Sequence, residues 1–251
     1  MKTGHKVCIG IVNDGSLNSQ LVVDLIGIVR APNSRFDSLV QVANIGTTTK
    51  SRNVVVLNYL KMSSAEWLLL VDSDEQLPLD AFNKLCDTAH DKERKVVSGL
   101  VFAQFGDDVT GLRPIPTLYR EFPGEGLVAW DDYPEDSVVK IDAAGTGCLL
   151  IHRSVIELMQ ENAVPNQGHA WAWFLEAAIN GIYWGEDILF SKRLKSLGVQ
   201  MYAHTGAILK HQKKFWLDQR QHEQFREHAI AQALAAQSSE PTPPSVEGTL
   251  G

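Results

Sequence analysis

Hydrophobic and polar residues alternate along this chain in blocks that predict strands and helices in turn. Mostly apolar runs, the pattern of buried strands, occupy residues 7–12, 39–43, 67–71 and 96–102. The segments after the first three runs predict helices, over residues 21–29, from Ser51 after a polar loop at 46–50, and after Pro78. Strand and helix therefore alternate, which predicts an α/β fold built on a doubly wound, mostly parallel sheet.

The pattern changes after residue 102. Residues 103–140 contain four prolines and several glycines, and this stretch is too long for a simple connection, so we expect an excursion at an active site. The run 141–151 predicts a returning strand with a bend marked by glycines. Ser154 and Glu157 have the spacing of a capping box, which predicts a helix over 155–161.

The last third of the chain predicts one more helix, one more strand and a polar tail. The helix begins near Gly185 and should stop at Gly198, and residues 199–209 predict the last strand. We expect residues 1–214 to form one domain and 215–237 a helical extension of it. Residues 238–251 are rich in serine, threonine and proline, a composition that predicts a disordered tail.

The strongest chemical signal follows the third apolar run. Five apolar residues, 67–71, predict a strand buried on both faces, and Asp72-Ser73-Asp74 comes directly after it. Open α/β folds bind ligands at this edge of the sheet, and paired carboxylates suit Mg²⁺ or Mn²⁺ shared with phosphates. An isolated Asp-x-Asp is more often a turn or a helix cap. Glu75 adds a third acid, however, and a cation would offset their repulsion.

Composition limits which binding partners and which cellular compartment we expect for this protein. The net charge is −7 and lysine and arginine form no block, which argues against nucleic acid as a partner. The three cysteines lie far apart and are odd in number, so neither a disulfide framework nor a zinc motif emerges. The sequence shows no signal-peptide pattern and no apolar segment of membrane-spanning length, so we expect a cytoplasmic protein without a membrane span.

An ordered series of motifs resembles one enzyme family. The first predicted strand ends in Asn13-Asp14-Gly15, Ser51-Arg52-Asn53 follows, and Asp72-Ser73-Asp74 comes third. The segments 145–153 and 185–193 fit the same series. Over roughly residues 6–212 the chain resembles glycosyltransferases of the GT-A fold, family 2 type, and most of all their bacterial and bacteriophage members. The resemblance implies transfer of a sugar from a nucleoside-diphosphate sugar to an acceptor hydroxyl on a glycan, a protein or a small molecule.

The resemblance also implies a metal-binding set, with Mn²⁺ or Mg²⁺ as the cofactor. Asp74 is the firmer expected ligand, while Asp72 binds metal directly, binds it through water, or holds the donor's ribose. Ser73 belongs to the same donor-binding turn. His211 is expected to complete the metal site, and His204 is the competing candidate. The cation would stabilise the charge that develops on the diphosphate leaving group.

Five further residues are expected to bind the donor. Asn13 and Asp14 either contact its base or ribose or form an ordinary Asx turn. Arg52 offers a charged fork of donors near the diphosphate, an assignment that depends on the resemblance. Gly145 and Gly147 lack the third glycine of a dinucleotide fingerprint, and we expect them to permit backbone approach to the donor sugar or the acceptor.

Glu186 and Asp187 are the expected catalytic acids on the acceptor side. The family pattern favours Asp187 as the base that takes the acceptor's proton, with Glu186 in support. Acids at this position also stabilise a helix dipole without any catalytic role. The nearby Trp171 and Trp173 either stack on sugars or belong to the core, and we expect one of them in the core.

Three other functions compete with this interpretation. A phosphatase of the haloacid dehalogenase type also uses Asp-x-Asp after a strand, but Gln76 stands where that motif normally has threonine or valine. A nucleotidyltransferase of similar fold would carry a basic, glycine-rich loop after the first strand, and residues 13–16 lack the basic residue. A sugar-nucleotide-binding remnant without catalysis is the third alternative, although both aspartates, His211 and the Glu-Asp pair are present.

Overall fold

The computed structural model describes residues 5–13, 15–43, 45–105, 113–124, 126–162 and 172–213, with isolated positions between 219 and 231. The chain divides into two units, Met1–Gln212 and Lys213–Gly251. In the second unit the described positions between 219 and 231 are helical, while the predicted tail at 238–251 lies outside the described residues. A helical extension over 215–237 therefore remains a prediction. No helix among the described residues is long and apolar enough to cross a bilayer.

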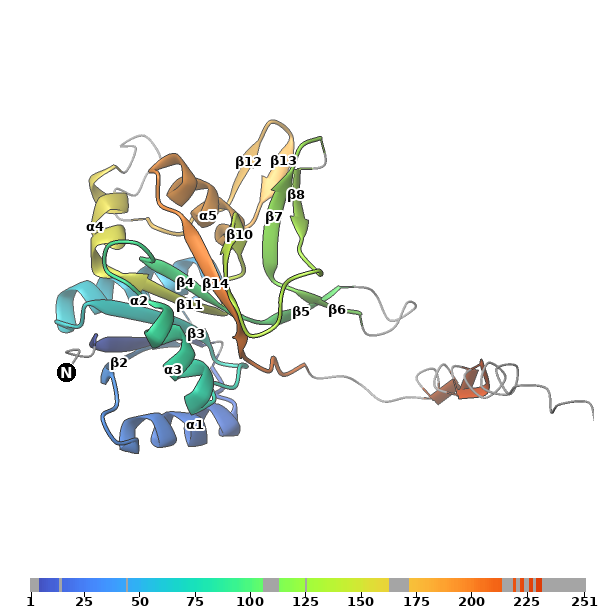
Figure 1. The fold of residues 1–251 in the computed structure, drawn as a ribbon, viewed down its shortest axis with the longest axis horizontal. Coiled ribbons are helices and arrows are strands. Elements are labelled where there is room, and N and C mark those ends of the chain that lie inside the picture. The colour runs from blue at the N-terminus through green and yellow to red at the C-terminus, as the bar shows by residue number, and fades with distance from the viewer. Residues whose placement is uncertain are drawn as a thin grey trace, which may run out of the picture. The chain divides into compact units, whose positions relative to one another are not determined.

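A mixed sheet of seven strands forms the centre of the first unit (Figure 1). Its spatial order is β2-β1-β3-β11-β4-β14-β9. The strands are β1 (Val7–Asn13), β2 (Phe36–Ala43), β3 (Trp67–Asp72), β4 (Val96–Leu100), β9 (Val138–Ile141), β11 (Cys148–His152) and β14 (Met201–Ile208). Only β11 and β9 run antiparallel to their neighbours. The predicted α/β class with a mostly parallel sheet is confirmed.

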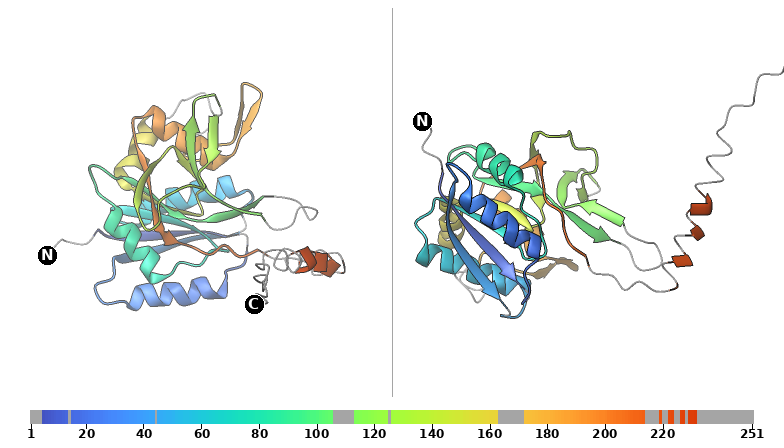
Figure 2. Two further views of the ribbon diagram at one scale, coloured as in Figure 1. Left: turned by 45° about the vertical axis from the view of Figure 1, so that its right-hand side comes forward. Right: turned by 90° about the horizontal axis from the view of Figure 1, so that it is seen from below.

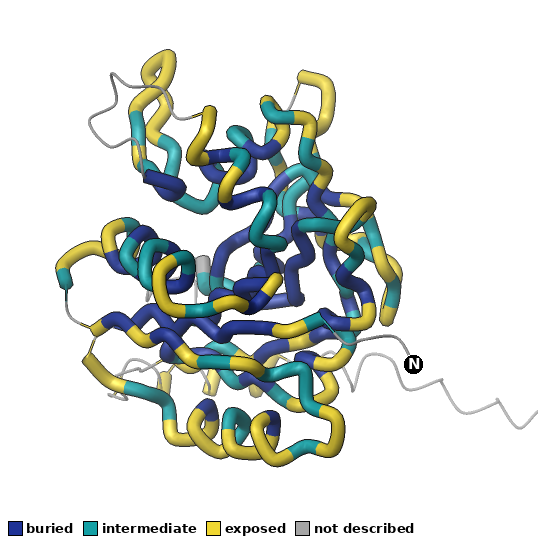
Figure 3. The backbone as a smooth tube through the Cα atoms, turned by 90° about the vertical axis from the view of Figure 1, so that its left-hand side faces the viewer, coloured by how far each residue is buried: buried dark blue, intermediate teal, exposed yellow. Residues whose placement is uncertain are grey.

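Helices cover both faces of this sheet, as the alternating pattern predicted. They are α1 (Ser19–Arg30), α2 (Thr48–Met62), α3 (Leu79–Thr88), α4 (Arg153–Glu161) and α5 (Glu186–Ser196). Leu68 and Leu70 of β3 pack with residues of α2, α4 and α5, whereas Trp67, Leu69 and Val71 pack with those of α1 and α3. Alternate residues of a strand point to opposite faces, so β3 is buried on both. Buried residues gather in the interior of the first unit, and exposed residues lie along its outer helices and loops (Figure 3).

Smaller strands make up much of the rest. They are β5 (Phe102–Phe105), β6 (Arg113–Pro116), β7 (Leu118–Phe122), β8 (Gly126–Ala129), β10 (Ala143–Ala144), β12 (Ala177–Ile179) and β13 (Ile182–Trp184). The hairpins β7–β8 and β12–β13 lie at the opposite end of the first unit from α1 (Figures 1 and 2). The described part of the predicted excursion at 103–140 thus holds short paired strands.

Three predicted boundaries were wrong, one because of a pairing with a distant segment and two because of helix caps close in the sequence. The run 96–102 divides into two strands, because the Val101 carbonyl accepts from Thr117 N at 2.9 Å and the chain leaves the main sheet. Helix α2 begins three residues early, because Thr47 Oγ1 accepts from Lys50 N at 3.2 Å. Helix α4 is capped by His152 and not by Ser154.

The predicted stop of α5 at Gly198 is confirmed. Gly198 has a φ of 72°, a left-handed conformation that glycine adopts without a Cβ penalty. Gly198 N donates to Lys195 O at 3.1 Å and Val199 N to Leu194 O at 3.0 Å, the two bonds of a Schellman motif.

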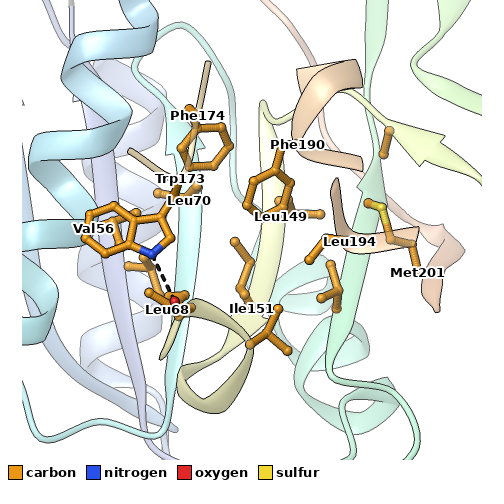
Figure 4. Close-up of a cluster of buried hydrophobic side chains, with 14 of the residues drawn as sticks. Val56, Leu68, Leu70, Leu149, Ile151, Trp173, Phe174, Phe190, Leu194 and Met201 are labelled. Atoms are coloured by element: carbon orange, nitrogen blue, oxygen red, sulfur yellow. Dashed lines mark hydrogen bonds between the residues drawn. The ribbon is translucent and has the colours of Figure 1, made fainter. Parts of the chain in front are cut away.

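An aromatic cluster holds α5 against the sheet (Figure 4). Phe174 and Phe190 stack with ring centroids 4.5 Å apart, and both are buried. Trp173 is 1% exposed and donates from Nε1 to Ile156 O at 2.9 Å. Trp173 therefore belongs to the core, as expected for one of the two tryptophans, while Trp171 lies outside the described residues.

Candidate functional site

The site forms where the turn after β3 meets the chain after β14. Gln76 N donates to Lys210 O at 2.9 Å, and Gln212 N donates to Asp74 O at 2.8 Å. These two backbone bonds set His211 beside Glu75 in an isolated β-bridge. Two segments far apart in the chain thus meet at the carboxyl edge of the parallel strands, where open α/β sheets bind ligands.

Three side chains at this junction form a group with the composition of a metal site. One ligand atom each from Asp74, Glu75 and His211 lies within 4.8 Å of the others. His211 Nε2 lies 2.9 Å from Asp74 Oδ2, and His211 Nδ1 lies 3.7 Å from Glu75 Oε1. The contact with Asp74 is the main reason why the pKa of His211 is raised from its ordinary value.

The geometry of this group fits a hard divalent cation. Two adjacent ligands of an octahedral ion, each ~2.1 Å away, lie ~3 Å apart, and the Nε2–Oδ2 separation of 2.9 Å matches this spacing. His211 Nδ1 lies 3.0 Å from the Phe102 carbonyl, a contact that orients the ring and leaves Nε2 as the nitrogen facing Asp74. Two carboxylates and one imidazole suit Mn²⁺ or Mg²⁺.

Glu75 is the member of this group that sequence reasoning did not name as a ligand. Its side chain is 1% exposed, less than any other acid described, and a buried carboxylate is costly unless cations or hydrogen bonds compensate it. The sequence contained a signal, since Glu75 was the third acid in one turn. Its burial beside His211 depends on the β14 segment and was not visible from the local pattern.

Asp72 is engaged by an arginine and lies outside this group. Both of its carboxylate oxygens accept from Arg52 Nη2, at 3.0 and 2.9 Å. Arg52 Nη1 donates to Glu186 Oε1 at the start of α5. Burial raises the pKa of Asp72, although the guanidinium opposes this shift. The structure thus brings Asp72, Arg52 and Glu186 together, and both terminal nitrogens of Arg52 face carboxylates.

Asp187 follows Glu186 directly and lies in the first turn of α5. Its Oδ1 accepts from Ile188 N at 2.7 Å. Burial raises the pKa of Asp187, and repulsion from Glu186 adds to the shift. A carboxylate whose pKa is moved towards neutrality is a better proton acceptor, so its electrostatics suit a general base. The position also matches the non-catalytic alternative, in which an acid at a helix N-terminus only stabilises the helix dipole.

Gly145 and Gly147 allow close approach between parts of the protein itself. A Cβ on Gly145 would lie 2.9 Å from Thr117 Cβ, and Gly145 N donates to Thr117 O at 2.8 Å. A Cβ on Gly147 would lie 3.0 Å from Glu75 Oε1 and 3.6 Å from Asp72 Oδ2. Gly147 therefore leaves room for the carboxylates of the site, whereas Gly145 packs against Thr117, between β6 and β7.

Replacing Gly147 by alanine is expected to lower Mn²⁺ affinity roughly tenfold or more, as outer contacts of metal ligands do, because Glu75 must shift. Overpacking should also cost ~1–3 kcal/mol of stability. Gly27→Ala is the matched control, since a Cβ there meets nothing within 4 Å. Calorimetry with Mn²⁺ checks both variants, and unchanged affinity in Gly147→Ala would remove Glu75 from the metal site.

The predicted donor-binding residues of the first strand have local partners. Asn13 is 6% exposed, and its Oδ1 accepts from Gly15 N at 2.5 Å, which is an Asx turn. Asp14 lies outside the described residues. Ser73 is buried and links β1 to α1, since Ser73 N donates to Val12 O and Ser73 O accepts from Asn18 N, each at 2.9 Å. A donor contact by these three residues remains a prediction.

His204 belongs to a different set of contacts. Its Nδ1 accepts from Gly206 N at 3.1 Å and lies 4.0 Å from Asp136 Oδ1. Burial is the main reason why its pKa is lowered. Within the described residues the metal-competent group contains His211 and not His204. Of the two histidines that the sequence left open, the structure therefore favours His211 as the metal ligand.

Comparisons with known proteins link this chain to others by fold alone. No protein-family model and no curated protein matches the sequence. Among solved structures, A197 from STIV matches with a TM-score of 0.52 at 16% identity, over 85% of this chain and 97% of that one. GalNAc-T7 with UDP, GalNAc and Mn²⁺ matches at 10% identity over 98% of this chain, which spans only 53% of that one. Its TM-score of 0.48 is below the level that establishes a common fold.

Proposed function

We propose that this protein is a metal-dependent glycosyltransferase of the GT-A type that moves a sugar from a nucleoside-diphosphate sugar to an acceptor hydroxyl. The observation that carries the proposal is the Asp74–Glu75–His211 group at the carboxyl edge of the sheet. A cation held by these residues would stabilise the negative charge that develops on a diphosphate leaving group. The order of motifs along the chain supports the same function.

The residues divide the work between donor and acceptor sides. Asp74, Glu75 and His211 would hold Mn²⁺ or Mg²⁺ at the turn after β3. Asp187, at the start of α5, would take the proton of the acceptor hydroxyl, and its raised pKa favours that task. Glu186 is held by Arg52 and would support the position of Asp187. A base that takes a proton as the new bond forms fits inversion at the anomeric carbon.

One observation weighs against the phosphatase alternative. In a phosphatase of the haloacid dehalogenase type the first aspartate of Asp-x-Asp must attack phosphorus as a nucleophile. Here both oxygens of Asp72 accept hydrogen bonds from Arg52, whose side chain is only 5% exposed. A carboxylate bound on both oxygens to a buried cation is a poor nucleophile, so the arrangement favours transfer over phosphate hydrolysis.

A panel of nucleoside-diphosphate sugars, incubated with the wild-type protein with and without Mn²⁺, tests the proposal. We expect hydrolysis of at least one donor that depends on Mn²⁺ and stops after chelation, because water replaces the acceptor. Binding of a donor without any turnover would instead support a sugar-nucleotide-binding remnant. Release of inorganic phosphate from simple phosphomonoesters would support the phosphatase alternative.

A further inference from the structure

We infer that Arg52 is a positioning residue that ties the carboxyl end of β3 to the acceptor-side start of α5. The inference rests on the proposed function and gives Arg52 a task different from holding a diphosphate. Its Nη1 donates to Glu186 Oε1, and its Nη2 donates to both oxygens of Asp72, at 3.0 and 2.9 Å. One planar fork thus fixes two carboxylates that lie far apart in the chain.

The burial of this link favours a fixed role over a ligand-binding one. The exposed fraction of the side chain is 5% for Arg52, 18% for Glu186 and 26% for Asp72. A diphosphate would have to displace a carboxylate before it could reach either terminal nitrogen of Arg52. Buried ion pairs demand close geometry, and loss of one partner leaves the other charge uncompensated. Arg52 therefore acts as a link between two segments.

Asn53, the next residue of α2, makes a second link to the same region. Its Nδ2 donates to Phe174 O at 2.7 Å, and its Oδ1 accepts from Trp173 N at 2.8 Å and from Phe174 N at 3.0 Å. Two consecutive residues of one helix thus hold the segment ahead of α5 and the first residue of α5 itself. This second set of bonds supports the same role for the start of α2.

The consequence concerns Asp187, which follows Glu186 directly. A fixed Glu186 holds the first turn of α5 and hence the place from which Asp187 reaches an acceptor. Displacing a positioned group by ~1 Å can cost roughly 10²-fold in rate. Loosening Arg52 should therefore slow transfer to the acceptor much more than donor hydrolysis, which needs the metal group and water.

Arg52→Lys keeps the charge, removes the fork and tests this role. We expect the kcat of transfer to fall roughly 10²-fold, while donor KM, Mn²⁺-dependent hydrolysis and the calorimetric Kd for Mn²⁺ stay near wild-type values. Glu186→Gln breaks the same link at its other end and should likewise lower the kcat of transfer while leaving donor hydrolysis and Mn²⁺ affinity unchanged. This second variant tests the inference even if Arg52→Lys does not fold. The double variant should lose little more than the worse single one, because both act through one contact.

Arg35→Lys is the matched control, since Arg35 pairs with Asp87 outside the site, and it should leave every readout unchanged. A wild-type kcat in Arg52→Lys would overturn the inference. So would a raised donor KM alone, which returns Arg52 to the diphosphate, or a parallel fall of transfer, hydrolysis and folded fraction, which marks a purely structural role. A wild-type protein without Mn²⁺-dependent hydrolysis refutes the proposed function first and the inference with it.

Discussion

Asp187→Asn is expected to lower the kcat of sugar transfer by ~10²–10⁴-fold, the usual contribution of a positioned general base. Asparagine keeps the shape of the side chain and can still accept from Ile188 N, but it cannot take the acceptor's proton. Donor affinity should barely change, because the metal group holds the diphosphate. Steady-state kinetics with saturating donor and a calorimetric titration of the nucleoside diphosphate measure the two effects separately.

The stability of the same variant separates catalysis from a helix-dipole role. The pKa of Asp187 is raised in the folded state, so at neutral pH its ionised form is less stable there than in the unfolded chain. Removing that charge should leave the melting temperature unchanged or raise it. A simple dipole partner predicts the reverse, a loss of ~0.3–1 kcal/mol of stability with normal turnover. Near-normal turnover would point to Glu186 or to a retaining mechanism.

Asp80→Asn provides the control for this comparison. Asp80 is also an acid in the first turn of a helix, α3, but its side chain is 77% exposed and pairs with Lys84 outside the site. Its replacement should change stability slightly and turnover not at all. The pH profile adds a further check. Transfer by the wild type should rise with pH through a pKa above the ordinary aspartate value, and this limb should vanish in Asp187→Asn.

His211→Ala is expected to weaken Mn²⁺ binding by ~10²-fold or more, since even outer contacts of metal ligands are worth 10–100-fold. Hydrolysis of the donor should fall with it, because the cation stabilises the leaving diphosphate. Asp74→Asn should reduce activity by a comparable ~10²-fold, the scale of lost charge stabilisation at a transition state. Calorimetry with Mn²⁺, followed by donor hydrolysis at saturating metal, measures both consequences.

His204→Ala is the matched variant on strand β14. His204 contacts Gly206 and Asp136 and lies outside the metal-competent group, so Mn²⁺ affinity should stay at the wild-type value. The opposite result, normal binding in His211→Ala and lost binding in His204→Ala, would move the site to the other histidine. Wild-type Mn²⁺ affinity in both variants would mean that neither histidine is a metal ligand and that the carboxylates alone form the site.

Much of the fold was predictable because its causes are local. Five apolar residues ahead of Asp72 predicted a doubly buried strand, and β3 is that strand. The stop of α5 at Gly198 needs only a left-handed residue, which glycine supplies. Strand β11 was predicted as a returning strand, but its insertion between β3 and β4 in the antiparallel sense was not. Pairing between distant segments depends on the whole chain and leaves no local trace.

The candidate site shows the same division between local and distant causes. The sequence by itself determined that acids end a buried strand, that an acidic pair begins a late helix, and that histidines follow the last strand. Tertiary structure decided which of them meet. Backbone bonds from Gln76 and Gln212 bring His211 to Asp74 and Glu75. Arg52 was predicted near a diphosphate from the resemblance alone, whereas its contacts with two carboxylates arise because β3 and α5 converge on its buried guanidinium.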